Sequence, residues 1–242
     1  MAWTFLQMQD KVLGWLDDTG DNDRMRTMCK QVLNDAQLAR ATEYPWSFMI
    51  KTVAGIAPIT AGSGLYSLPA DFYRPLVCWD VGGQRMMTEV PPRSFEVIGA
   101  NPALTIGAGY LSGVYRPFIY RRGQAVVEGV LVNNIFVQCL DEGQTYPASI
   151  NVSYYAVPSE LSADADLSVF PFPHEQLLVY DAVLDLKTYA SESIDLIPLI
   201  ARKRDDALRR LYESQKAAQT TGAFGGYVHL DDTLLVPDPR YT

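Results

Sequence analysis

The segment at residues 44–72 most constrains the fold, because the spacing of apolar residues changes across it. Helical periodicity precedes this segment, and alternating, strand-like patterns follow it. Pro45 disfavours helical dihedral angles at Tyr44 and therefore predicts the end of the preceding helix. Trp46 and Phe48 are two residues apart, which is the period of a strand, so we expect both side chains on one face. We predict that this aromatic pair fills the junction between a helical layer and a sheet.

Two helices are predicted before this segment and two near the end of the chain. Residues 4–16 carry apolar residues at three- and four-residue steps, and Thr4 can cap the start of the helix. A second helix is expected to begin at Asp23 after a short polar link, which favours an antiparallel pair with the first helix. Residues 174–190 are apolar around most of the helix, which predicts a position at the centre of the helical layer. The fourth helix is expected at residues 194–218.

The middle of the chain is predicted to be a β domain. Strands are expected at residues 49–56, 65–68, 76–81, 85–90, 115–120, 125–132, 135–140 and 150–157. Turns are expected where Gly, Asn or Asp residues cluster, at residues 82–83, 122–124, 133–134 and 141–145. In residues 150–157, apolar side chains alternate with polar ones, which is typical of a sheet with one covered face. The Gly- and Pro-containing residues 91–113 are expected to form a long loop or an insertion.

Together these patterns predict an α+β fold for the 242 residues of the chain. We expect a helical bundle built from an N-terminal and a C-terminal helix pair, in residues 1–43 and 171–219. Between them, residues 44–170 are expected to form an antiparallel β domain with residues 91–113 as a loop insertion. Residues 220–242 are expected to form an extended C-terminal arm.

The C-terminal arm is too apolar for a free linker. Its Gly and Pro residues oppose both a helix and a central strand. Burial of its large side chains offsets less free energy than ordering its backbone costs, so the arm requires backbone hydrogen bonds to another element or a second chain. We therefore predict that the arm binds a partner through Phe224, Tyr227, Leu230, Leu234, Leu235, Val236 and Tyr241.

The composition limits the classes of function. The formal net charge is −8, from 28 acidic and 20 basic residues. This balance argues against a protein that reads DNA or RNA sequence, but not against one that lets nucleic acid pass without binding it. No apolar stretch approaches the ~20 residues of a membrane helix, and we expect no secretory leader and no membrane contact.

Candidate catalytic and ligand-binding residues are few, and we expect no catalytic centre, cofactor site or metal site. The three cysteines are scattered, form no metal-binding spacing and are expected to be buried and reduced. His174 is expected to be a partly exposed residue at a helix start, and His229 a contact residue of the arm. A glycosidase needs two carboxylates about 5–10 Å apart in one cleft, whereas the adjacent Asp205 and Asp206 are expected to diverge.

A run of basic residues lies along the fourth predicted helix, at residues 202–210. This run is interpreted either as a solvated helix face or as a face that meets an acidic neighbour in an assembly. In the second case Arg202 and Arg209 are candidate partner-binding residues.

Four short motifs follow one another in a recognisable order. They are YPWSF at residues 44–48, YSLPADF at residues 66–72, YYAVP at residues 154–158 and FPHEQLLVY at residues 172–180. In their order and spacing, the chain resembles the head-to-tail adaptor (connector) proteins of tailed bacteriophages, especially the tubular-tail and tail-accessory adaptors of short-tailed phages. Residues 91–113 have no counterpart in this resemblance.

The resemblance implies a structural function rather than an enzymatic one. Adaptors of this family form a ring, usually of twelve copies, under the portal protein, extend the DNA channel and support the nozzle or tail. The implied partners are sister copies, the portal protein, a tail or nozzle protein, and double-stranded DNA that passes without sequence-specific binding. The implied location is the head–tail interface of the virion, after assembly in the host cytoplasm. The alternatives are another tail-completion structural protein and a tail-associated cell-wall hydrolase, which needs two carboxylates, one with a raised pKa.

Overall fold

The chain divides into two compact units, Met1–Ala36 with Ser162–Thr242 and Gln37–Leu161. The computed structural model describes residues 2–16, 23–82, 85–93, 95–96, 118–127, 130–139, 145–189 and 196–220. The sequence analysis placed the domain limits at residues 43–44 and 170–171, where predicted helices end or begin. These limits stay a prediction. Most of the predicted loop at residues 91–113 lies outside the described residues.

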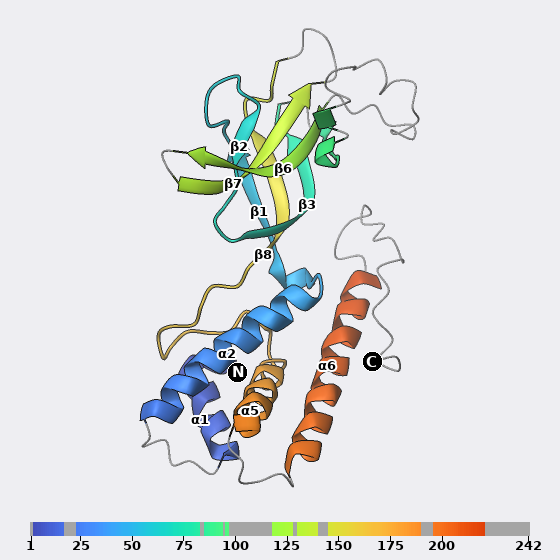
Figure 1. The fold of residues 1–242 in the computed structure, drawn as a ribbon. Helices are drawn as coiled ribbons and strands as arrows, with labels where there is room; N and C mark the ends of the chain where they lie inside the picture. Colours follow the sequence, from blue (N-terminus) through green and yellow to red (C-terminus); the bar gives the residue numbers. More distant parts are fainter. Residues whose placement is uncertain are drawn as a thin grey trace. The chain divides into compact units, whose positions relative to one another are not determined.

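The helical unit contains the predicted helices. It holds α1 (Phe5–Trp15), the first part of α2 (Asp23–Glu43), α5 (Gln176–Tyr189) and α6 (Ile197–Thr220) (Figure 1). The start of α1 is a capping box, as the Thr4 side chain accepts from the Gln7 backbone N–H and the Gln7 side chain accepts from the Thr4 backbone N–H at 3.0 Å. The predicted cap at Thr4 is therefore confirmed.

α5 is the most buried helix described in this unit, as its apolar circumference predicts. Leu177, Leu178, Ala182 and Val183 are all 0% exposed. α5 contacts both α1 and α6, and the ion pair between Asp10 of α1 and Arg26 of α2, at 3.2 Å, adds a link between those two helices. The predicted antiparallel pairing of α1 with α2 stays a prediction, because the principal helical contact of α1 is with α5.

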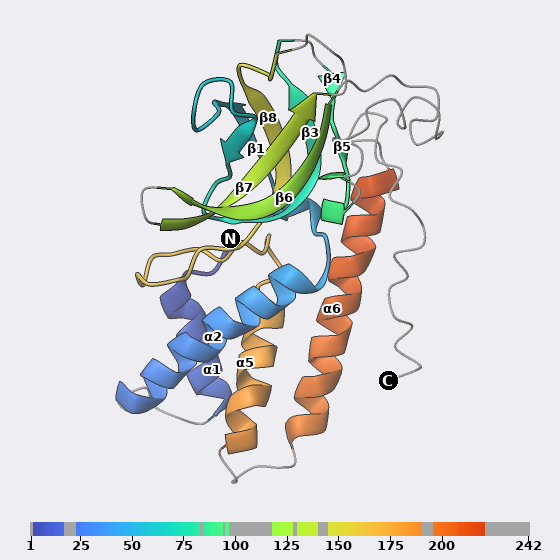
Figure 2. The same cartoon turned by 45° about the horizontal axis from the view of Figure 1, so that its top comes forward.

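In its described residues, the second unit contains two four-stranded sheets, with strand orders β1-β8-β3-β4 and β2-β7-β6-β5 (Figure 2). The strands are β1 (Ile50–Ile56), β2 (Leu65–Ser67), β3 (Phe72–Asp80), β4 (Arg85–Met86), β5 (Thr88–Glu89), β6 (Phe118–Val127), β7 (Val130–Cys139) and β8 (Ile150–Ala156). The pairs are antiparallel apart from the short β5, which runs parallel to β6. The α+β class with antiparallel sheets is thus confirmed.

Both sheets contribute to one apolar core. Its buried members are Tyr66, Leu68, Phe72, Cys78, Met87, Phe118, Tyr120, Ile135, Val137, Ile150, Val152, Tyr154 and Ala156. The alternation predicted for the last strand places Ile150, Val152 and Tyr154 in this core. The alternation is incomplete, because Tyr155 is only 7% exposed.

The predicted turns at residues 122–124 and 133–134 are wrong. β6 and β7 are each ten residues long and run through both places, with Gly123 paired to Asn134. Continuous cross-strand pairing over the two strands outweighs the weak local turn preference of Gly and Asn. Gly123 serves packing instead, because a Cβ atom there would lie 2.8 Å from Cε2 of Phe136.

The expected strand at residues 85–90 is also divided. β4 pairs antiparallel with β3, which confirms the predicted pairing of the strands on either side of residues 82–83. Met87 then donates its backbone N–H to the Cys78 carbonyl oxygen at 2.9 Å and buries its side chain in the core. The chain leaves one sheet at Met87, and β5 joins the other.

The junction after α2 is helical rather than extended. α2 ends at Glu43, as Pro45 predicts, but residues 47–49 form a short 3-10 helix, so the strand spacing expected for Trp46 and Phe48 is wrong. The two rings nevertheless stack, with centroids 5.8 Å apart and planes inclined by 14°. The buried Trp46 donates its indole N–H to the Arg40 carbonyl oxygen at 2.6 Å.

The turn before β2 offers a paired test of this packing. Gly62 and Gly64 both have positive φ angles, +73° and +62°. At Gly62 a Cβ atom meets open space, whereas at Gly64 it would lie 2.7 Å from the Val137 carbonyl oxygen and 2.5 Å from the Tyr146 ring. We expect Gly62→Ala to lower the free energy of unfolding by about 1–2 kcal/mol through backbone strain alone. Gly64→Ala should lower it by about 3 kcal/mol or more, since overpacking is added to the same strain.

Denaturant unfolding of both variants measures this difference. Equal losses in the two variants would show that β2 does not pack against β7 as closely as described.

Candidate functional site

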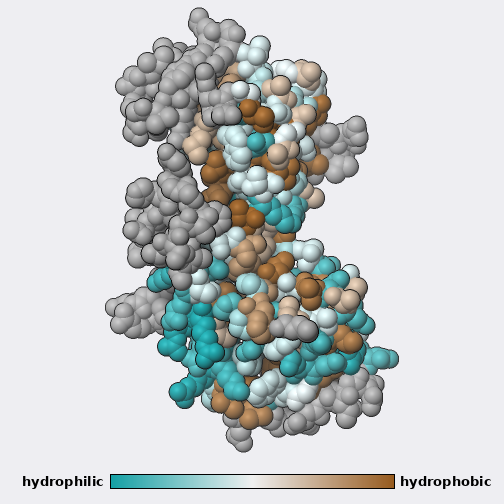
Figure 3. Space-filling view, turned by 180° about the vertical axis from the view of Figure 1, so that it is seen from behind, coloured by the Kyte–Doolittle hydropathy of each residue, from teal (hydrophilic) through white to brown (hydrophobic). Residues whose placement is uncertain are grey.

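The outer face of α6 is charged, and hydrophilic residues gather over it at the left of Figure 3. Arg204 pairs with Asp205 at 2.7 Å, and Arg209 pairs with Asp206. Arg202 is exposed and has no hydrogen bond or ion pair among the described residues. Two of the five basic residues in the predicted run are therefore neutralised within the helix, whereas Arg202 keeps its charge available.

The predicted contact residues of the C-terminal arm lie outside the described residues. They are Phe224, Tyr227, Leu230, Leu234, Leu235, Val236 and Tyr241, and His229 lies outside as well. Of the residues proposed from sequence to bind a partner, the structure places Arg202 and Arg209, both exposed on α6.

A groove of about 550 Å³ opens on the helical unit beside α1 and α5. Its lining residues are Trp3, Lys11, Gly14, Trp15, Gln176, Val179 and Tyr180. Trp15 and Tyr180 meet edge to face, with ring centroids 6.3 Å apart. The Lys11 ammonium lies 4.2 Å from the Trp3 ring centroid, and that of Lys203 lies 4.9 Å from the Trp15 ring centroid. Aromatic walls with two nearby cations suit a segment that carries both apolar and acidic side chains.

Glu175 holds the N-terminal segment near this groove. The Trp3 backbone N–H donates to its Oε1 at 3.3 Å, while Oε2 is buried without a hydrogen-bond partner. The neighbouring His174 is half-buried, as expected from the sequence. Burial lowers its pKa, and the negative charge of Glu175 opposes that shift.

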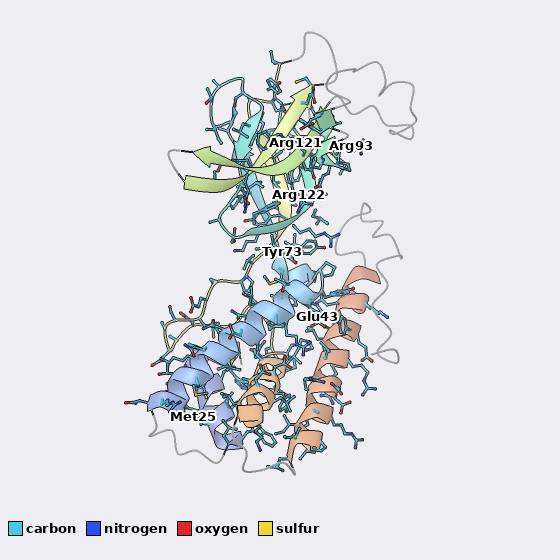
Figure 4. All side chains as sticks on the ribbon, in the orientation of Figure 1. Met25, Glu43, Tyr73, Arg93, Arg121 and Arg122 are labelled. Carbon is cyan, nitrogen blue, oxygen red and sulfur yellow. The ribbon has the colours of Figure 1, made fainter. Side chains whose placement is uncertain are left out.

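The β unit carries further arginines, of which Figure 4 labels Arg93, Arg121 and Arg122. Arg122 donates from Nε to Glu89 Oε1 at 2.6 Å. The Arg121 guanidinium lies over the Phe136 ring, with its central carbon 4.3 Å from the ring centroid. The two adjacent arginines therefore differ, because one has a carboxylate partner and the other has an aromatic one.

The described titratable groups with strongly raised pKa values are buried ones. Burial raises the pKa of the Cys78 thiol to about 12. The pKa of Tyr120 is also raised, first by burial and then by the charge of Glu89. Cys29 and Cys78 are buried free thiols, as predicted, and Cys139 is half-buried. Within the described residues, no group of three or more His, Cys, Asp or Glu side chains is placed to hold a metal ion.

These surfaces are suited to protein contacts, and comparison with known families agrees. The SU10 adaptor protein family matches residues 3–226, which is nearly the whole chain. The chain belongs to this family. The resemblance to phage head-to-tail adaptors is confirmed, and the protein is a structural adaptor of the phage virion. No curated protein matches the chain in sequence. Among the described helices of the adaptor, none combines the length and apolar character needed to cross a membrane.

Two of the motifs that indicated an adaptor meet at Asp71. Lys51 donates to its Oδ2 at 2.6 Å, and the Tyr154 hydroxyl donates to its Oδ1 at 2.8 Å. The Asp71 carbonyl oxygen also accepts the Val157 backbone N–H at 2.7 Å. The motifs at residues 66–72 and 154–158 are therefore joined by hydrogen bonds, a contact that motif spacing did not predict.

Asp71 also predicts how the stability of the adaptor depends on pH. Burial opposes the charge of Asp71, but the hydrogen bonds from Lys51 and Tyr154 outweigh it and lower the pKa of Asp71. A lowered folded-state pKa stabilises fully above the ordinary value of about 3.9, and this stabilisation is lost as pH falls through the folded-state pKa. Between about pH 5 and 2, Asp71→Asn should therefore lose less free energy of unfolding than the wild-type chain.

Urea unfolding at a series of pH values measures this effect. Asp35→Asn is the control, because Asp35 is exposed and has no ion pair or hydrogen bond among the described residues. An unchanged acid dependence in Asp71→Asn would contradict the prediction.

Proposed function

We propose that this adaptor is the subunit of a closed ring that joins the portal to the tail or nozzle and extends the DNA channel. The ring has twelve copies, is assembled in the host cytoplasm and lies at the head–tail interface of the virion. Its role is structural, without catalysis or a cofactor. The observation that carries this proposal is the family match over residues 3–226.

The charge of the chain supports the passage of DNA. With 28 acidic and 20 basic residues, the subunit has a formal net charge of −8, which does not favour the retention of phosphates. Double-stranded DNA can then slide past the wall without sequence-specific binding. A ring also repeats each subunit contact at every interface, so contacts that are weak singly hold the assembly together.

We further propose that the two helix pairs form one bundle and that the C-terminal arm, residues 220–242, attaches to a neighbouring subunit or to the portal. The groove beside α1 and α5 supports this role, because its chemistry matches that of the arm. The arm combines its large apolar residues with Asp231, Asp232 and Asp238. The groove offers aromatic walls with Lys11 and Lys203 beside them.

Mass measurement of the purified chain, alone and with portal protein, tests the proposed function. We expect a closed ring that associates with portal. A chain that remains monomeric and ignores portal would overturn the proposal, whereas a ring located elsewhere along the tail axis would favour a tail-completion role.

The proposed roles of the arm and of the α6 face each predict the effect of a change in the chain. Deletion of residues 222–242 should leave the circular dichroism spectrum and the melting temperature of the core unchanged while abolishing docking to portal.

The double variant Arg202→Glu, Arg209→Glu should weaken assembly, because the charge that meets an acidic neighbour is reversed.

Arg74→Glu is the control for the charge reversal, because Arg74 is an exposed arginine that belongs to β3 and not to α6. Unchanged docking after the deletion refutes the role of the arm, and equal effects of the two charge reversals refute a specific role for α6.

A further inference from the structure

Arg121 is half-buried and lies on the same face of β6 as Ile119, which is 1% exposed. Its neighbours Phe118 and Tyr120 belong to the core, so the alternation along the strand directs Arg121 away from it. The guanidinium carbon lies 4.3 Å from the centroid of the Phe136 ring and 5.4 Å from that of Phe95. Two aromatic rings therefore hold the guanidinium in one place.

Gly123 makes this arrangement possible. A Cβ atom at residue 123 would lie 2.8 Å from Cε2 of Phe136 and 3.3 Å from Nη1 of Arg121. Only a glycine leaves room for the ring and the guanidinium together. The residue that resembled a turn signal in the sequence is therefore part of the support for Arg121.

The guanidinium of Arg121 lacks the partner that such a group normally has. Its Nε is buried without a hydrogen-bond partner, and no carboxylate among the described residues forms an ion pair with it. A buried donor without an acceptor is costly, so its retention calls for an explanation. By contrast, the next residue, Arg122, donates to Glu89 at 2.6 Å.

We propose that Arg121 anchors a docking site on β6 and β7 for an aspartate or glutamate side chain of a neighbouring copy of this chain, an inference that rests on the proposed ring. The arginine fork matches a carboxylate with two parallel hydrogen bonds. The Phe95 and Phe136 rings pre-organise the guanidinium plane, so little conformational entropy is lost on binding. Arg93, which is exposed and lies two residues before Phe95, adds positive charge to this segment of the chain.

A protein carboxylate fits this surface better than a DNA phosphate. Binding along a DNA backbone requires several free cations. Arg122 lies on the opposite face of β6 and is paired with Glu89, and the exposed Glu96 lies next to Phe95. An arginine between aromatic side chains is instead typical of the centre of a protein–protein interface.

A second copy is the occupant that the charge balance supports. The chain has 28 acidic and 20 basic residues, so each copy carries unpaired carboxylates. Among the described residues, the exposed Asp35, Glu160 and Glu213 have neither an ion pair nor a hydrogen bond. In a head-to-tail ring, two different surfaces of the subunit meet at each interface, so the Arg121 surface faces another part of the neighbour.

Sedimentation velocity of the full-length chain over a range of concentrations tests the inference. Arg121→Met keeps a side-chain stem between the two rings but removes the charge and the donors. We expect its self-association to weaken by about tenfold or more, since the neighbour's carboxylate loses its partner. Its melting temperature should be unchanged or higher, because a buried donor without an acceptor has been removed. Arg121→Lys keeps the charge without the fork and should weaken association less.

Arg122→Met is the matched control on the adjacent residue. It should leave self-association within about twofold of wild type, as a paired arginine on the opposite face of the strand takes no part in docking. Wild-type association by Arg121→Met, or an equal loss in Arg122→Met, overturns the inference.

The remaining outcomes separate this inference from the proposed function. A wild-type ring that persists in Arg121→Met overturns the inference alone, whereas a wild-type chain that never associates, with or without portal, overturns both. Binding to a short DNA duplex that is lost in Arg121→Met, with association intact, would assign the site to phosphate instead.

Discussion

A buried aromatic side chain with a polar tip must find a hydrogen-bond partner, and the β unit depends on three such side chains. Trp46 donates to the Arg40 carbonyl oxygen at 2.6 Å. The hydroxyl of Tyr66 donates to the Pro147 carbonyl oxygen at 2.5 Å, and that of Tyr154 donates to Asp71 at 2.8 Å. Each of the three rings is at most 1% exposed. The hydrogen bonds therefore fix the junction after α2, the second sheet and β8 while the rings fill the core.

Aromatic rings also order polar groups on the surfaces of the two units. Arginine and lysine side chains lie against aromatic rings in both units, at Lys11, Lys203 and Arg121. Such contacts keep a cation ordered while its outer edge stays open to a partner. A structural adaptor works through surfaces of this kind, and its family membership and its charged, aromatic faces point to the same role.

Local patterns predicted the elements more reliably than their connections. The start of α1 at its Thr4 cap, the end of α2 before Pro45 and the burial of α5 follow from short-range stereochemistry and apolar periodicity. The prediction that turns interrupt β6 and β7 was wrong, because the antiparallel pairing of the two long strands outweighs the local turn preferences of Gly123 and Asn134. The prediction of strand spacing at Trp46 and Phe48 was wrong for a similar reason. Ring stacking and the indole hydrogen bond of Trp46 accompany a 3-10 helix there instead of an extended backbone.

Some of the candidate sites could be predicted from the sequence, and others are formed only by the tertiary structure. The exposed arginines of α6 and the four family motifs were evident from the order of residues, because helix periodicity and motif spacing are properties of the chain alone. The aromatic groove, the contact of two motifs at Asp71 and the clamp around Arg121 join residues far apart in the sequence. The sequence by itself thus determined the helices, the β character of the middle of the chain, the acidic balance and the family. Only the tertiary structure decided where several strands begin and end and which side chains meet, because strand register and packing arise from non-local pairing.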